Sequence, residues 1–462
     1  MSLDPTAPQR LNALESRAAL GLAGIFSFRM LGLFLILPVF ALYAENLEGH
    51  TPVLVGMAIG IYGLTQALLQ IPFGMLSDRL GRKPMIVGGL LIFAIGSLVA
   101  ALSHSIWGVI LGRALQGSGA VAAVVMALAA DLTREQSRTK VMAVIGISIG
   151  FSFAVSMVLG PILNTWIGVP GIFWFTALLA LCGIAILLWV VPDPRESRPH
   201  RDAEPTAGQF RRILSNGDLL RLDFGILSLH MMLTALFIAV PLALRDEVGL
   251  ASGQHWLVYL PVMLLAMGLM VPFIVIAEKR RRMKTVFLSA ILALGVAEAA
   301  LAMVHATLWG LATALLFFFT AFNLLEASLP SLVSKTAPAD AKGTAMGVYS
   351  TSQFAGAFIG GLVGGWMHHR FGLEGVFLFC SGASLLWFLV AVGMAPPRYL
   401  SSHVLPVGEM DEAQAAELAA LLRDRPGVAE VVVVAAEGLA YVKIDSQQTS
   451  PAALDEFLRG QG

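Results

Sequence analysis

The sequence predicts an all-α membrane protein with twelve transmembrane helices in two six-helix pseudo-repeats, followed by a small α+β domain. Hydrophobic residues make up 57% of the 462 residues and charged residues only 13%, about half of the charged share in soluble proteins. With a mean hydropathy of +0.78, one soluble core could not bury this much apolar surface. A third observation, a repeat between the two halves of the chain, predicts how the helices are grouped.

Spans are expected where about 20 consecutive residues are mostly apolar, the length that crosses the hydrocarbon of a bilayer. In the first half these stretches lie at 19–44, 53–77, 84–103, 106–131, 139–163 and 171–191. In the second half they lie at 222–245, 253–277, 285–304, 308–334, 343–366 and 373–395. The expected organisation is an N-terminal tail (1–18), a first half (19–191), a linker (192–221), a second half (222–395), a short linker (396–402) and a terminal domain (403–462).

The positions of lysine and arginine predict the orientation of the chain. Of the 30 Lys and Arg residues, 22 lie in the N-terminal tail, in the loops after even-numbered spans, or just after the last span. Only Arg245 and Arg370 lie in the loops after odd-numbered spans. By the positive-inside rule, the N- and C-termini and the linker are therefore expected in the cytoplasm.

Composition and motifs argue against several functions. The formal net charge is zero, so no electrostatic footprint for nucleic acid is visible. Cys182 and Cys380 lie far apart in apolar stretches, which disfavours a disulfide framework or a thiolate metal site. The sequence contains no HExxH zinc motif and no GxxxxGK[ST] phosphate loop. We therefore expect no enzyme activity, no cofactor and no metal; the expected partners are the lipid bilayer, protons and a small-molecule substrate of unassigned identity.

The two halves resemble each other in sequence. With a shift of 200 residues, 70–87 aligns with 270–287, although Arg281 stands where the first copy has Gly81. Two six-helix halves of the same orientation imply a parallel repeat about an axis along the membrane normal. Such an architecture predicts a substrate site between the halves, near the middle of the membrane.

Three motifs carry a family resemblance. The loop after the second span reads Gly74-Met-Leu-Ser-Asp78-Arg79-Leu-Gly81-Arg82-Lys83, and it resembles the G-x-x-x-D-R-x-G-R-R/K signature of the major facilitator superfamily. Two further runs resemble the R-x-x-Q-G and antiporter motifs of that family: Arg113-Ala-Leu-Gln116-Gly117, and Gly146 and Gly150 followed by Gly160-Pro161. The runs SFRMLGLFLILPVF and NLLEASLPSL, together with the soluble tail, are similar to the YajR-type subgroup. This resemblance implies the major facilitator fold, an inner-membrane location and proton-driven efflux.

The charges of the signature loop are predicted to act at the cytoplasmic face. Asp78 and Arg82 flank a turn, and Asp131 ends the fourth span on the same side of the membrane. We expect the three to form a latch that holds an outward-facing state; the alternative is positive-inside charge with no role in motion. The second copy has Lys335 in place of Asp131, so an equivalent latch is not expected there.

The glycines of the fifth span have two interpretations. Gly146, Gly150 and Gly160 are expected to let helices approach closely, and Pro161 to free a backbone carbonyl. Packing alone is sufficient to explain this pattern, and only the family resemblance connects it with antiport.

Ionisable residues inside the spans are the sharpest functional signal, because a charge near mid-bilayer costs at least about 2.5–3.5 kcal/mol. Arg29, Arg113, Glu298 and Glu326 are of this kind. Glu326 lies near the centre of the tenth span with Asn323 one turn earlier on the same face. Since desolvation disfavours a charged carboxylate, we predict that Glu326 binds a proton or cation. The alternative, which is compatible with this role, is a structural pair with Arg29 or Arg113.

The remaining polar residues of the spans have weaker assignments. Arg113 and Gln116 match the R-x-x-Q-G motif, and they are expected either to steer protons or to anchor backbone carbonyls. Arg29 stands where many related drug exporters carry an acid, which argues against export of a broad range of cationic drugs and leaves room for an anionic or neutral substrate. His230 is able to titrate near neutrality, although a lone histidine is usually a packing residue. Glu298 is assigned a structural role, and three glutamines are predicted to line a cavity: Gln66, Gln70 and Gln353.

The soluble tail is predicted to fold as a ferredoxin-like βαββα domain. Strands are expected at 403–407, 428–435 and 438–445, with helices at 411–424 and 450–458. The run PGVAEVVVVAAEGLAYVKID resembles the second half of heavy-metal-associated domains, but the loop Gly408-Glu409-Met410 lacks their CxxC. Metal binding is therefore not expected; regulation, self-association and steric tuning of the cytoplasmic mouth remain open.

Together these observations predict a secondary active transporter that moves small solutes by alternating access, with proton-coupled efflux as the favoured mode. The alternatives are a proton-coupled metabolite symporter and a membrane sensor that signals through its terminal domain.

Overall fold

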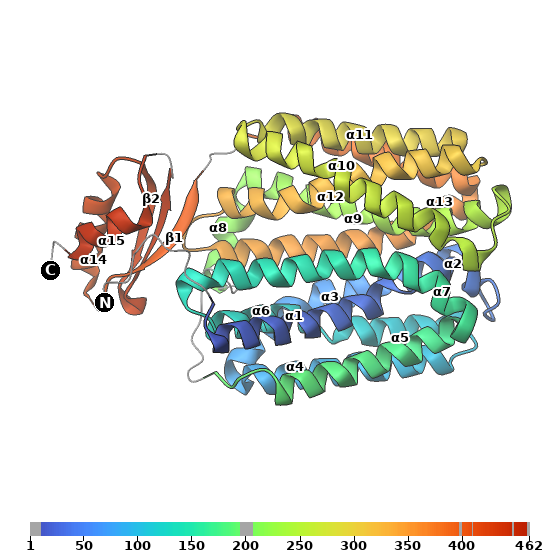
Figure 1. The fold of residues 1–462 in the computed structure, drawn as a ribbon, viewed down its shortest axis with the longest axis horizontal. Helices are drawn as coiled ribbons and strands as arrows, with labels where there is room; N and C mark the ends of the chain where they lie inside the picture. Colours follow the sequence, from blue (N-terminus) through green and yellow to red (C-terminus); the bar gives the residue numbers. More distant parts are fainter. Residues whose placement is uncertain (1–10, 195–206, 397–399, 409, 446–447, 460–462) are drawn as a thin grey trace.

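The computed structural model describes residues 11–194, 207–396, 400–408, 410–445 and 448–459. Its long helices run side by side along one axis, and the C-terminal domain lies at one end of this bundle (Figure 1). We call that end the domain face. The opposite end, which carries Glu45 and Arg245, is called the far face.

Seven helices form the first half: α1 (Ala13–Phe34), α2 (Leu37–Ala44), α3 (Pro52–Leu80), α4 (Arg82–Leu102), α5 (Ile106–Ser118), α6 (Ala122–Asp131) and α7 (Glu135–Trp189). The first helix begins six residues before the predicted span because Asn12 and Glu15 form a capping box, in which each side chain accepts a hydrogen bond from the backbone of the other. Short breaks divide α1 from α2 and α5 from α6, so each of these pairs makes a single apolar crossing.

The second half begins with a short 3₁₀ turn (Ala207–Gln209) and the helix α8 (Phe210–Leu214), inside the predicted linker. Its long helices are α9 (Gly217–Leu242), α10 (Trp256–Lys279), α11 (Met283–Val304), α12 (Leu308–Thr336) and α13 (Lys342–Val392). A π-helical turn (Ala243–Glu247) and a 3₁₀ turn (Ser252–Gln254) connect α9 to α10 at the far face.

Ten segments of the described chain are long and apolar enough to span a membrane. Two of them, Lys140–Trp189 and Lys342–Val392, have 50 and 51 residues, which is about 75 Å of helix and more than twice the bilayer hydrocarbon. Each is interrupted by one glycine with positive φ, Gly168 at 67° and Gly372 at 69°, where the helix turns back (Figure 1). Counting these two segments twice gives the twelve crossings that the sequence predicts.

The apolar core shows where the two halves meet. One cluster of buried side chains contains residues of both halves, and its first-half members come from the far-face ends of the helices, at 35–61, 100–110 and 153–173. A second cluster has buried members from the first half alone, mostly at the domain-face ends of its helices. The halves are therefore joined by a continuous core toward the far face.

The C-terminal domain has a three-stranded antiparallel sheet with two helices. Its elements are β1 (Ser401–Pro406), α14 (Glu412–Arg423), β2 (Val428–Val434), a 3₁₀ turn (Ala435–Glu437), β3 (Leu439–Ile444) and α15 (Pro451–Arg459). The strand order is β1-β3-β2, the central part of a ferredoxin-like sheet with one strand fewer than the full βαββαβ motif. Leu405, Leu422, Val442 and Leu454 belong to its small core. The predicted βαββα order and element positions are confirmed to within a few residues.

Candidate functional site

Three polar side chains from three helices of the second half converge inside the bundle. They are Glu326 of α12, Gln353 of α13 and His230 of α9. The Gln353 Nε2 atom lies 3.3 Å from Glu326 Oε1 and 2.8 Å from His230 Nε2. The third side of the triangle is the 3.9 Å distance between His230 Nδ1 and Glu326 Oε2. We call these three residues the Glu326 cluster.

The hydrogen bonds of the Glu326 cluster assign its protons. An amide nitrogen only donates, so in this orientation of Gln353 the His230 Nε2 atom accepts and the ring proton lies on Nδ1. That nitrogen faces Glu326 Oε2, which has no hydrogen-bond partner among the described residues. The Glu326 side chain keeps 37% of its accessible surface although it lies in the middle of a long helix. The unpaired oxygen itself is buried, so the carboxylate has one oxygen inside the bundle that no described residue satisfies and that a proton or solute could pair with.

Further unpaired polar atoms lie near the carboxylate. Asn323 is one turn before Glu326 on α12, as predicted, and its amide nitrogen has no partner within the described chain. The hydroxyl of Tyr349 on α13 is equally unpaired, and it interacts electrostatically with Glu326. Because buried polar groups without partners are costly, these atoms are suited to meet water or a polar solute.

Arg29 lies in the first half, held by glutamines and aromatic rings. Its side chain is buried, and Nη2 donates to Gln66 Oε1 at 2.5 Å. Gln66 in turn donates to Gln70 Oε1 at 3.1 Å, while the guanidinium lies 5.8 Å from the ring centre of Tyr62. Its Nε and Nη1 atoms have no hydrogen-bond partner among the described residues. Arg29 is thus a buried cation with free donors.

Arg113 is fixed more completely. Its guanidinium donates to the carbonyls of Ala58 and Ile59 on α3, at 3.4 and 3.3 Å, and to Gln116 Oε1 at 2.8 Å. Gln116 continues the chain to Ser97 Oγ at 2.7 Å. This network joins α3, α4 and α5, which is the arrangement of a structural anchor.

The structure does not pair Glu326 with either buried arginine. Within the described residues the carboxylate contacts Gln353 and His230, and no ion pair connects it to Arg29 or Arg113. The predicted alternative of a structural pair is therefore wrong for this conformation. Sequence reasoning also did not connect His230 and Gln353 with Glu326; their signal was the presence of a polar residue in each of three separate spans.

The signature loop forms a compact charge cluster. Arg82, buried at the start of α4, pairs with Asp78 at 2.5 Å and with Asp131 at 3.2 Å, and donates to Ser77 Oγ at 2.7 Å. These contacts join the domain-face ends of α3, α4 and α6. Arg79 is exposed, and Gly74 packs α3 closely against α6, where an added Cβ would lie 3.4 Å from Ala123.

The second repeat keeps an ion pair at the corresponding place with the charges exchanged. Lys335 Nζ lies 3.0 Å from Glu278 Oε1, where the first half has Asp131 and the signature loop. A residue with positive φ is found here too: Arg281 has φ of 51°, and it is the one non-glycine residue with positive φ in the described chain. The second repeat therefore has a charge cluster of its own, with different residues from those of the first.

The glycines of the fifth span behave differently from one another. An added Cβ at Gly160 would lie 2.5 Å from the Leu35 carbonyl oxygen, so this glycine does permit close packing next to Pro161. Nothing lies within 4 Å of a Cβ at Gly146 or Gly150. The prediction of close helix approach is wrong for these two, because they lie on an exposed face of α7 with Ile147.

Backbone contact seals the two halves toward the far face. A Cβ on Gly56 of α3 would lie 2.0 Å from the carbonyl oxygen of Gly361 on α13. Gly60 and Gly63 meet the backbone of Phe358 and Phe354 in the same way, at 2.9 and 2.4 Å. The absence of side chains on these glycines is what permits α3 and α13 to touch.

An ion pair adds to this closure. Arg245 after α9 donates to both oxygens of Glu45 after α2, at 2.5 and 2.9 Å, and so bridges the two halves. It also pairs with Asp246 at 2.5 Å. Glycine packing and ion pair together make this a conformation closed at the far face.

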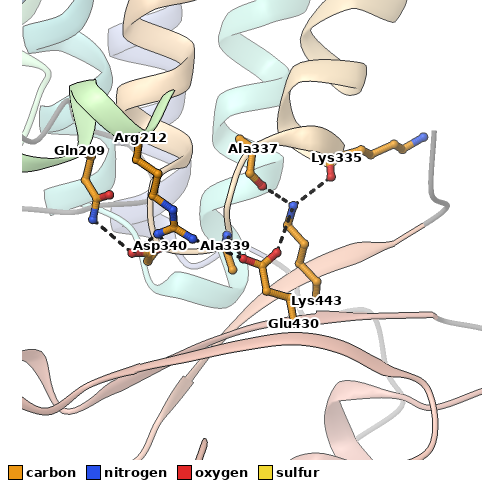
Figure 2. Close-up of polar contacts among 8 residues, drawn as sticks. All are labelled: Gln209, Arg212, Lys335, Ala337, Ala339, Asp340, Glu430 and Lys443. Atoms are coloured by element: carbon orange, nitrogen blue, oxygen red, sulfur yellow. Dashed lines mark hydrogen bonds and ion pairs between the residues drawn. The ribbon is translucent and has the colours of Figure 1, made fainter. Parts of the chain in front are cut away.

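The C-terminal domain is attached to the helical bundle through the loop between α12 and α13 (Figure 2). Lys443 of β3 is 2% exposed, and its ammonium donates to the carbonyls of Lys335, at 2.8 Å, and Ala337. These carbonyls end α12 and have no partner within the helix. A cation at a helix C-terminus is also favoured by the helix dipole, so Lys443 caps the helix that carries Glu326.

Two more charges complete this junction (Figure 2). Glu430 of β2 accepts from the Ala339 backbone nitrogen at 3.3 Å and lies 3.7 Å from Lys443 Nζ. Arg212 of α8 donates to both oxygens of Asp340 at 2.9 and 3.1 Å. The junction therefore brings together the domain, the α12–α13 loop and the helix that precedes the second half.

Comparison with known proteins supplies a family. A profile of the Major Facilitator Superfamily matches residues 22–361 and, again, 225–441. The chain is 50% identical over 445 residues to the inner membrane transport protein YajR of Escherichia coli K12, an alignment that covers 96% of this chain and 98% of that protein. It is 25% identical over 343 residues to the multidrug resistance protein MdtH of Salmonella typhimurium, covering 73% and 83% of the two chains.

Among solved structures, the crystal structure of the human organic anion transporter MFSD10 (TETRAN) aligns with a TM-score of 0.62. The sequences are 21% identical, and the alignment covers 82% of this chain and 100% of that one. At this identity the likeness concerns the fold alone.

Proposed function

Because this chain belongs to the major facilitator superfamily and is an inner-membrane secondary transporter, we propose that it exports small solutes in exchange for protons. The observation that carries the proposal is the Glu326 cluster. A carboxylate inside the bundle has one weak hydrogen bond, a histidine at 3.9 Å and an oxygen without a partner. If a proton and a solute compete for this carboxylate, binding of one releases the other. The movements of the two across the membrane would then be coupled.

Export is favoured over import by the relatives. MdtH proteins are named multidrug resistance proteins, and a membrane transporter can confer resistance by removing compounds from the cell. Arg29 of the first half indicates the substrate class. Two of its nitrogens are unpaired, and no acid of the described chain neutralises its charge. This cation favours anionic or neutral solutes.

The domain face is proposed to be cytoplasmic. It carries most of the 22 Lys and Arg residues that the positive-inside rule assigns to that side. The conformation described above is then closed on the side opposite the cytoplasm. Since Asp78, Arg82 and Asp131 are paired in this state, we propose that the cluster braces the first half while the far face is closed.

The test uses inside-out membrane vesicles energised to an acidic interior and a pH-sensitive dye. A panel of organic anions, sugars and lipophilic cations is added to vesicles with wild type, Glu326→Gln or Glu298→Gln. Glu298 is the matched control, since it is a buried acid of α11 outside the cluster. A compound that releases the proton gradient with wild type and Glu298→Gln but not with Glu326→Gln supports the proposal. Release by all three proteins would remove Glu326 as the proton site.

A second candidate, a sensor that signals through its domain, is favoured by one observation. Lys443 caps α12, so a ligand at Glu326 and the domain act on the same helix. A sensor would bind a compound in proteoliposomes without moving it. Movement of a compound in the same direction as protons would instead identify a symporter.

A further inference from the structure

A groove of about 560 Å³ opens on the domain face of the second half, away from the Glu326 cluster. Its first wall is the beginning of α11 and its second wall is the end of α13. Lining positions along α11 recur every three to four residues, so they share one face of the helix. The groove is therefore a continuous furrow between two packed helices.

The end of this furrow at the domain face is cationic. Arg281, Arg282 and Lys284 line it together with Thr285. Arg281 faces one carboxylate, Asp445 of the C-terminal domain, at 3.4 Å. Lys284 donates to the Val392 and Met394 carbonyls, and Arg282 is exposed. Within the part of the chain that the structure describes, Asp445 is the one acid that pairs with these three cations, so this end carries a net positive charge.

The backbone at Arg281 marks this end as unusual. Its φ of 51° is a left-handed conformation that costs a residue with a Cβ about 1–2 kcal/mol. The corresponding residue of the first half is Gly81, which adopts positive φ without that cost. Non-glycine residues in such conformations cluster at binding and catalytic sites. The strained backbone at Arg281 therefore points to a function for its side chain.

The other end of the furrow, away from the domain face, is apolar and lies inside the membrane-spanning part of the chain. It is lined by Leu288, Leu292 and Phe388, and Leu292 is 51% exposed. From Met283, where α11 begins, to Leu292 the helix rises about 14 Å, roughly the hydrocarbon depth of one leaflet. The furrow thus begins at the membrane surface and ends near the depth of an acyl chain.

We propose that this furrow binds an anionic phospholipid. The phosphate is held by Arg281, Arg282 and Lys284, and one acyl chain lies along Leu288 and Leu292. Basic pockets between helices at a membrane surface bind acidic headgroups by the same combination of charge and depth. Since Arg281 also faces Asp445, the lipid would lie at the edge of the junction between membrane and domain.

The test is a lipid titration of the purified full-length protein in detergent, followed by native mass spectrometry. Phosphatidylglycerol is compared with zwitterionic phosphatidylethanolamine for wild type, Arg282→Gln and Ser289→Phe, which fills the furrow with a ring. Arg370→Gln is the matched control, because it removes one exposed arginine at the far face. Thermal unfolding of each variant checks that it is folded.

We expect wild type to prefer phosphatidylglycerol, with binding about fivefold weaker in Arg282→Gln, the effect of one lost cation near a membrane surface. Ser289→Phe is expected to lose the preference, and Arg370→Gln to keep it. Equal binding of the two lipids, or an unchanged preference in Arg282→Gln, would overturn the proposal. Displacement of the lipid by millimolar inorganic phosphate would also overturn it, since it would identify a site for free phosphate.

Discussion

Arg281 occupies the turn that Gly81 occupies in the first half, and both residues have positive φ, 51° and 91°. The repeat keeps a residue with positive φ here, but the connection is longer: residues 280–282 lie between α10 and α11, whereas Gly81 alone lies between α3 and α4. Gly81 is the residue between α3 and α4, and forming this turn is its one role. Arg281 adds a guanidinium beside the domain and the lipid-facing furrow.

This relationship predicts unequal effects of two substitutions on stability. Gly81→Ala should lower the free energy of unfolding by about 1–3 kcal/mol, because alanine is strained at this φ. Arg281→Gly should leave it within about 1 kcal/mol of wild type, since relief of strain offsets the greater freedom of glycine in the unfolded chain. Thermal unfolding in detergent, followed by tryptophan fluorescence, measures both. A Gly81→Ala protein as stable as wild type would contradict the strain assigned to this turn.

The glycine contact between the halves predicts a block of closure. In Gly361→Ala, the new Cβ would lie 2.4 Å from the Gly56 carbonyl oxygen, and overpacking of this kind costs about 1–3 kcal/mol. The population closed at the far face should fall about tenfold, and transport should fall with it. Spin-label distances across the far face report the populations. Gly268→Ala is the control, because nothing lies within 4 Å of its Cβ; equal effects of the two would rule out the contact as the cause.

The ion pair at the far face should have a smaller influence. Arg245 and Glu45 are partly exposed, at 35% and 42%, and exposed pairs contribute about 0.2–1 kcal/mol. Glu45→Gln should therefore shift the same distance distribution toward the open form by up to about fivefold, and added salt should shrink the difference. Asp246→Asn leaves the bridge between the halves intact and should change little. The prediction fails if Asp246→Asn opens the far face as much as Glu45→Gln.

Lys443 is predicted to hold the C-terminal domain in place. A cation at a partly buried helix C-terminus contributes up to about 2 kcal/mol, so Lys443→Met should reduce the docked population about tenfold. Distances between spin labels on the domain and on α12 should then become broad. Arg423→Met, at an exposed position of α14, should leave them narrow. Unchanged distances in Lys443→Met would mean that other contacts attach the domain.

The fold was largely predictable from the sequence, because hydropathy, charge asymmetry and strand patterns are local properties. The spans at 171–191 and 373–395 were predicted as helices separate from those before them, and the non-helical glycines Gly168 and Gly372 lie in the predicted gaps. The break in hydropathy located these turns because the chain reverses where an apolar stretch ends.

The site was less predictable, since it depends on which helix faces meet. Glu326 stood out because an acid is rare within a span, but its partners His230 and Gln353 lie on two other helices. Gly146 and Gly150 have GxxxG spacing and yet face open space, whereas Gly56 and Gly361, which each begin a GxxxG run, form a close backbone contact between the halves. Spacing along one helix cannot distinguish these cases.

The role of Glu326 is tested most directly by separating exchange from coupling in proteoliposomes, with a substrate found in the vesicle panel. Glu326→Gln should still exchange labelled for unlabelled substrate at equal pH, while losing accumulation driven by a proton gradient. Glu298→Gln should retain both activities. If Glu326→Gln accumulates substrate against its gradient as wild type does, then the Glu326 cluster does not couple protons to transport.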